Sequence, residues 1–144
     1  MTTTLLEFVI PATVSLFVAA GTMWWTTHSN RTQTNLNLRK AKKEELLSSL
    51  YYLKSATTDF KFFVYDGKSS PDRIIEKKEL FISRINILLE MYFVCDNLDL
   101  HDIPIKTNAF FLNTGNYRHE ADRLYSEAID SIDNAIKEVV GIKA

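Results

Sequence analysis

A long, uncharged and mostly apolar block of residues lies near the N-terminus. The eighteen residues from Phe8 to Trp25 carry no charge, and a helix over residues 5–25 is long enough to cross a bilayer core. A cleaved secretory signal ending near Ala19-Ala20-Gly21 is one alternative, and a buried soluble helix is another. No Lys or Arg precedes the block, whereas a signal peptide begins with a positive region. The pattern therefore favours a retained transmembrane anchor, which we assign to residues 1–28.

After a polar stretch, apolar residues recur at the spacing of a helix. One seam advances in steps of three and four residues: Leu46, Leu50, Leu53, Thr57, Phe60 and Val64. A turn over residues 66–71 separates this helix from a second, Pro71 to about Asn97, whose wide apolar surface suggests the central helix. A third helix is expected from about residue 117 to 140. The pattern predicts an all-α fold, in which the transmembrane helix is followed by a three-helix, up-down-up (antiparallel) bundle over residues 45–144.

The connection over residues 96–116 is longer than a bundle needs, and such loops often carry short elements or functional residues. It contains an apolar triplet that is too hydrophobic to be left in water: Phe110, Phe111 and Leu112. The triplet either folds back to plug one end of the bundle or forms an exposed patch for a protein partner or the membrane surface.

Basic residues follow the apolar block, and none precedes it. The five are Arg31, Arg39, Lys40, Lys42 and Lys43. The positive-inside rule then places the N-terminus outside and the C-terminal body in the cytoplasm of a plasma or inner membrane. Residues 29–44 become a polar and basic juxtamembrane stalk. Its charges could also bind anionic lipid head groups.

Small side chains line one face of the apolar block at the same three- and four-residue steps. They are Ala12, Ser15, Ala19 and Thr22. Small faces let membrane helices approach closely, so this face is a candidate contact with a second copy. The alternative is that such residues are simply common in membrane helices.

Composition narrows the class of protein. The chain has 144 residues, four Gly and three Pro, which suits one helical domain better than a β-rich fold. Cys95 is the only cysteine, so no intrachain disulfide can form. Residues 44–144 are net acidic, because the N-terminal part holds the excess of basic charge. An acidic body does not suit nucleic acid.

Motifs that would indicate chemistry are missing from the sequence. The stretch from Cys95 to Asp102 is rich in possible metal ligands, but it lacks the spacings typical of zinc sites. There is no phosphate-binding loop and no nucleophile elbow. The sequence therefore predicts no catalytic residue, cofactor, metal or small-molecule substrate.

Three classes of function remain, the third being an enzyme with an unrecognised site near His101 and His119. The first is a non-enzymatic, membrane-anchored interaction or scaffolding module, whose partners are the lipid bilayer and another protein or a second copy. The second is a membrane effector that oligomerises through its transmembrane helix to form a pore or perturb the bilayer, with the bundle as its sensor.

Overall fold

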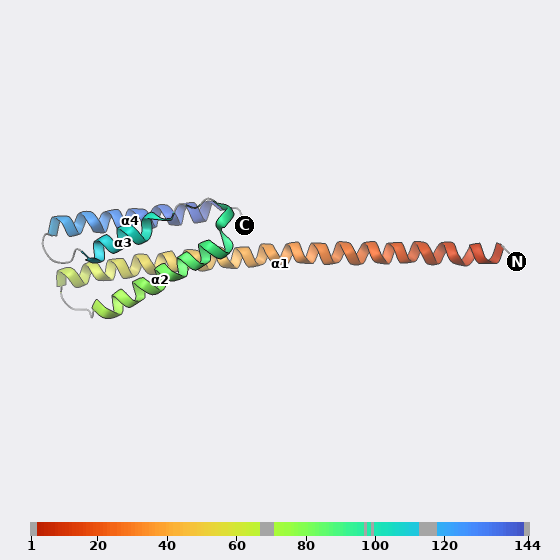
Figure 1. Cartoon of the computed structure of the whole chain (residues 1–144), viewed down its shortest axis with the longest axis horizontal. Coiled ribbons are helices and arrows are strands. Elements are labelled where there is room, and N and C mark those ends of the chain that lie inside the picture. The colour runs from red at the N-terminus through yellow and green to blue at the C-terminus, as the bar shows by residue number, and fades with distance from the viewer. Residues whose placement is uncertain (1–2, 67–70, 97, 99, 113–117, 143–144) are drawn as a thin grey trace. The chain divides into compact units, whose positions relative to one another are not determined.

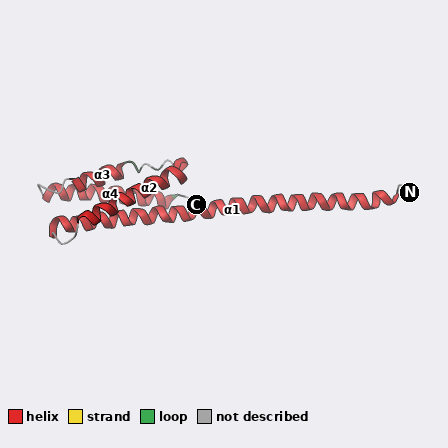
Figure 2. Cartoon of the chain, turned by 60° about the horizontal axis from the view of Figure 1, so that its bottom comes forward, coloured by secondary structure: helices red, strands yellow, loops and turns green. Residues whose placement is uncertain are grey.

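A computed structural model describes residues 3–66, 71–96, 98, 100–112 and 118–142, without the side chains of residues 3–16, 66, 71, 95 and 118. Four α-helices make up most of this part of the chain (Figure 1): α1 (Thr3–Asp66), α2 (Pro71–Tyr92), α3 (Asp102–Leu112) and α4 (Arg118–Gly141). The 3₁₀ turn η1 (Val94–Asp96) follows α2. No strand occurs among the described residues (Figure 2), which confirms the all-α prediction.

The chain divides into two compact units, residues 1–38 and residues 39–144, and α1 contributes to both. The second unit contains the remainder of α1 together with η1 and α2, α3 and α4, and its contacts are those of a helical bundle. The predicted connection over residues 96–116 contains η1 and the whole of α3, so it is not a simple loop. Asp102 opens α3 with a favourable first-turn carboxylate, and Pro104 lies in the same turn, where a missing N–H costs little.

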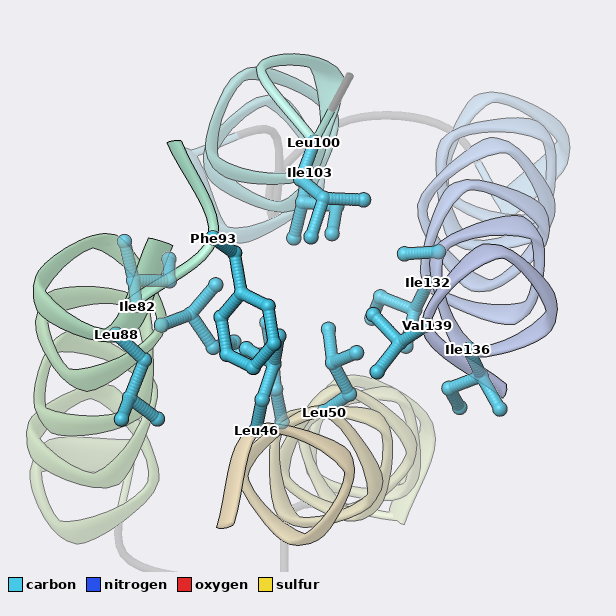
Figure 3. Close-up of a cluster of buried hydrophobic side chains, with 13 residues drawn as sticks. Leu46, Leu50, Ile82, Leu88, Phe93, Leu100, Ile103, Ile132, Ile136 and Val139 are labelled. Carbon is cyan, nitrogen blue, oxygen red and sulfur yellow. The ribbon is translucent and has the colours of Figure 1, made fainter. Parts of the chain in front are cut away.

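The main core of the second unit draws on every helix and on the link between α2 and α3 (Figure 3). Leu46, Leu50 and Leu53 of α1 have no exposed surface. They pack with residues from the other elements: Ile82, Ile85, Leu88, Phe93, Leu100, Ile103, Ile132, Ala135, Ile136 and Val139. The seam predicted for α1 is therefore confirmed, with Val64 alone only partly buried. α2, whose wide apolar surface suggests a central helix, leaves Ile75 39% exposed.

A second cluster is mainly aromatic. The ring of Phe60 stacks on Phe111 at a centroid distance of 4.0 Å and meets Phe110 edge-on at 5.6 Å. Phe110 also contacts the ring of Tyr125 on α4. Ala56, Ile74, Leu124 and Ala128 complete the buried set. This cluster attaches the C-terminal end of α3 to α1 and α4.

Two threonines are fully buried within the bundle. The hydroxyl of Thr57 donates to the carbonyl of Leu53 at 2.8 Å, as is common in helices. The hydroxyl of Thr107 has no hydrogen-bond partner among the described residues. Removing a hydroxyl from water costs free energy, and without a hydrogen bond in the bundle nothing offsets that cost.

We expect Thr107→Val to stabilise the bundle by about 1 kcal/mol, because valine has the same shape and no polar atom to desolvate. Thr57→Val is the matched control, and it should cost stability because it removes a satisfied hydrogen bond. Urea denaturation followed by circular dichroism measures both. A Thr107→Val variant that unfolds at lower urea than the wild type contradicts the expectation.

The first unit is described from its helical backbone and from the side chains of residues 17–38. Every one of those side chains is exposed. Within the described part of the chain, no helix is both long enough and apolar enough to cross a membrane. Much of the span predicted over residues 5–25 lies outside the described side chains, which begin at Phe17.

Candidate functional site: the basic residues of α1

The sequence predicts that five basic residues of α1 lie beside the membrane and set its topology, and the structure gives three of them other contacts. Arg39 lies at the start of the second unit, where its Nη2 donates to Oδ1 of Asp96 in η1. The Asp96 side chain is 18% exposed and that of Arg39 is 40% exposed, so the pair is partly shielded from water. Arg39 therefore ties α1 to the turn that follows α2.

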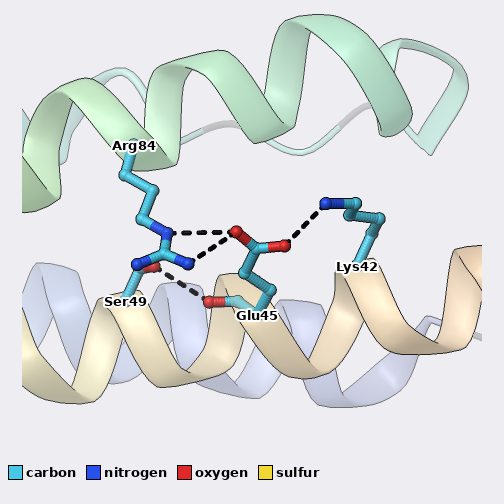
Figure 4. Close-up of polar contacts among 4 residues, drawn as sticks. All are labelled: Lys42, Glu45, Ser49 and Arg84. Atoms are coloured by element: carbon cyan, nitrogen blue, oxygen red, sulfur yellow. Dashed lines mark hydrogen bonds and ion pairs between the residues drawn. The ribbon is translucent and has the colours of Figure 1, made fainter.

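Lys42 and Glu45 form the next contact, one helical turn further along α1 (Figure 4). Lys42 Nζ donates to Oε2 of Glu45 at 2.8 Å. The other carboxylate oxygen, Oε1, accepts from Nη2 of Arg84 on α2 at 2.7 Å and from its Nε at 3.1 Å. One carboxylate thus joins α1 to α2 and is held by two cations.

These contacts shift the pKa of both partners on α1. The hydrogen bond from Lys42, followed by those from Arg84, holds the pKa of Glu45 below its ordinary value. The same bond raises the pKa of Lys42. A lowered carboxyl pKa adds stability above the ordinary pKa, and that stability is lost as pH falls through the lowered value. Glu45 therefore supports the α1–α2 contact at neutral pH and releases it in acid.

Lys43 contacts the chain at the C-terminal end of α4. Its Nζ donates to the backbone carbonyl of Val140 at 3.0 Å and to that of Ile142. The last carbonyls of a helix have no partner within the helix, and they carry the negative end of its dipole. Lys43 thus caps the C-terminal end of α4.

We name Arg39, Lys42 and Lys43 the basic clasp, because they join the start of the second unit to η1, to the Glu45–Arg84 pair and to α4. The two other predicted basic residues differ from them. Lys40 and Arg31 are exposed, and neither has an ion pair among the described residues. Three of the five cations therefore bind protein groups, and two remain available to a ligand or a surface.

Loss of Lys43 should weaken the bundle more than loss of its exposed neighbour. We expect Lys43→Met to lower the free energy of unfolding by about 1 kcal/mol, because the end of α4 loses its charged cap. Lys40→Met removes an equal charge without a partner and should change stability far less. Chemical denaturation of the two variants compares them directly. Equal losses would mean that net charge, rather than the cap, matters.

Two further ion pairs attach α1 to α4. Lys54 Nζ lies 2.6 Å from Oδ1 of Asp133, and Lys61 Nζ lies 3.1 Å from Oδ1 of Asp122. Hydrogen bonds from Tyr65 and then Lys61 lower the pKa of Asp122. Among the described residues, the ion pairs between elements of the second unit thus all connect α1 to another element.

The remaining predicted site residues fall in different places. Phe110 and Phe111 are buried in the aromatic cluster, so they do not form a surface patch with Leu112, which is 84% exposed. On the proposed contact face, Ala19 and Thr22 are exposed. The side chains of Ala12 and Ser15 lie outside the described residues.

From the sequence alone, the clasp residues are expected beside the membrane. The partners of Arg39 and Lys43 in the bundle lie far along the chain, so local spacing does not indicate them. Arg39 and Asp96 are 57 positions apart, and Lys43 and Val140 are 97 positions apart. The spacing of Lys42 and Glu45 was the one local signal available, since side chains three residues apart meet on a helix. Among the described side chains, no three His, Cys, Asp or Glu residues are grouped as a metal site would require.

No protein-family model matches this chain, and no curated protein or solved structure is detectably similar to it. Its function has to be argued from its own residues.

Proposed function

We propose that this chain is a single-pass membrane protein whose helical bundle serves as a non-enzymatic interaction or scaffolding module at the cytoplasmic face. The observation that carries the proposal is the uncharged segment from Phe8 to Trp25, which lies within α1. The side chains described in its second half include Phe17, Val18 and Met23, all more than half exposed. Lipid would remove that apolar surface from water.

The orientation follows from the cations that come after this segment. All five count toward topology, because the positive-inside bias acts during insertion, before the bundle has formed. In the folded protein Arg31 and Lys40 are the cations free to meet anionic head groups. The bundle helices would follow in the antiparallel order that the sequence predicts.

The outer surface of α2 supports an interaction role for the bundle. Leu80, Ile87, Met91 and Val94 are all more than half exposed. Their spacing of seven, four and three residues places them along one stripe of α2 and its continuation into η1. An apolar stripe of this length on a charged helix is typical of a protein contact surface.

Tryptophan fluorescence tests the anchor, because Trp24 and Trp25 are the only tryptophans in the chain. In vesicles of phosphatidylcholine and phosphatidylglycerol we expect blue-shifted emission that brominated lipids quench, since tryptophan favours the membrane interface. Phe substitutions of each residue in turn assign the signal.

Emission typical of water-exposed tryptophan, from a chain that stays in the supernatant, contradicts the anchor. The same vesicles separate the two candidate functions. An interaction module leaves an encapsulated dye in place, whereas a pore-forming effector releases it.

A further inference from the structure

The helical segment over residues 17–38 has an unusual composition for an exposed helix. Arg31 is its only charged residue, and Thr, Asn and Ser dominate its second half. These residues are weak helix formers, and a helix that is polar on all sides without ion pairs is not stable alone in water. The hydroxyls of Thr26, Thr32 and Thr34 each donate to the carbonyl four residues earlier. The segment therefore needs a covering partner.

One face of this segment is hollowed and carries no charged residue. A shallow hollow is lined by Trp25, His28, Ser29, Thr32, Gln33 and Leu36. Residues at positions i, i+3, i+4 and i+7 form the hole that accepts a side chain in coiled-coil packing. Ser29, Thr32, Gln33 and Leu36 have this spacing, so the C-terminal part of the hollow is one such hole. Trp25 and His28 extend the hollow toward the N-terminus.

The charge distribution favours a second copy as the occupant. Arg31 does not line this hollow; it lines a separate one together with Thr27, Asn30, Thr34 and Asn35. When Ser29, Gln33 and Leu36 occupy the core of a parallel pair, Arg31 takes the outermost position of the heptad. Two copies then bring no like charges together. Gln33 and Ser29 can also hydrogen-bond across the pair.

We propose that residues 25–36 pair with the same residues of a second copy as a short, parallel, two-stranded coiled coil. The pairing rests on the proposed membrane anchor. Twelve helical residues span only about 18 Å, which is marginal for an independent coiled coil. Anchors in one bilayer hold two copies in the same orientation and raise their effective concentration. The steps of three and four residues also continue those of Ala19 and Thr22.

Site-specific disulfide crosslinking tests the pairing in the full chain. Cys95→Ala provides a cysteine-free background, and its circular dichroism spectrum and thermal unfolding should match those of the wild type. Ser29→Cys places a thiol in the proposed core, and Thr27→Cys places one in the opposite hollow. Both variants are reconstituted in phosphatidylcholine vesicles and oxidised with copper–phenanthroline. We expect Ser29→Cys to form a covalent dimer several-fold faster than Thr27→Cys.

A second substitution checks that the seam, and not mere proximity, drives the reaction. Gln33→Lys puts like charges into the core and should reduce dimer formation by Ser29→Cys, whereas Arg31→Gln should not. Equal crosslinking at Ser29 and Thr27, or none at either site in a vesicle-bound chain, overturns the pairing and leaves the anchor intact. A chain that does not sediment with vesicles overturns the anchor, and the pairing falls with it.

Discussion

Removal of residues 1–28 should release the chain from membranes completely. The deletion removes the proposed span with its eighteen uncharged residues. No comparable apolar segment remains in the sequence to hold the protein in lipid. The buried core is expected to survive, because every residue in its two clusters lies at Leu46 or beyond. The truncated chain should therefore appear in the supernatant of a vesicle sedimentation assay with the circular dichroism of a folded helical protein.

A point substitution gives the same test without a truncation. Val18→Arg places a charge within the span, at a cost of about 3 kcal/mol on insertion scales, so membrane partition should fall roughly 100-fold. Lys40→Gln lies outside the span and should leave partition unchanged. A truncated chain that is unfolded, or that still sediments with vesicles, would count against both the anchor and the independence of the bundle.

Phe60→Ala should be among the most destabilising single substitutions in the bundle. Phe60 is 2% exposed, and its ring contacts those of Phe110 and Phe111. Truncating a buried phenylalanine costs about 3–5 kcal/mol, because the lost burial is compounded by a cavity. A domain of this size has about 5–15 kcal/mol of stability, so the variant should be close to unfolding at 37 °C.

The matched control is Phe62→Ala, two residues along the same helix. Phe62 is largely exposed, and its removal should change the free energy of unfolding by less than about 0.5 kcal/mol. Urea denaturation of both variants gives the difference. Hydrogen exchange adds a local measurement, since loss of Phe60 should deprotect the C-terminal end of α3 before the last turns of α2, which pack in the other core cluster. Similar losses from both substitutions contradict the packing described for the aromatic cluster.

The helical periods predicted most of the second unit because they depend on local spacing. α2 starts at Pro71, as expected, but it ends at Tyr92 instead of near Asn97. The reason is Phe93, which is almost completely buried, and the chain turns through η1 directly after it. α4 runs from Arg118 to Gly141, within one residue of its predicted limits.

The apolar periods do not predict α3 as a helix, although two local signals are present. Asp102 and Pro104 suit a first helical turn, and Asp102 also pairs with Lys106 one turn later. The apolar triplet instead predicts either a plug at one end of the bundle or an exposed patch. Its outcome depended on burial: Phe110 and Phe111 turn inward, while Leu112, at the end of the helix, stays in water. Three consecutive apolar residues on a helix cannot all share one face.

The sequence by itself determined α2 and α4, the seam of α1 from Leu46 to Phe60 and the uncharged segment with its basic flank, because each of these is a matter of spacing along the chain. Only the tertiary structure decided what the basic residues do. Whether Arg39 and Lys43 meet lipid or protein depends on Asp96 and Val140, which lie far away in sequence and come within reach when the helices pack. Long-range partners of this kind leave no periodic signal, since packing geometry, and not local spacing, brings them together.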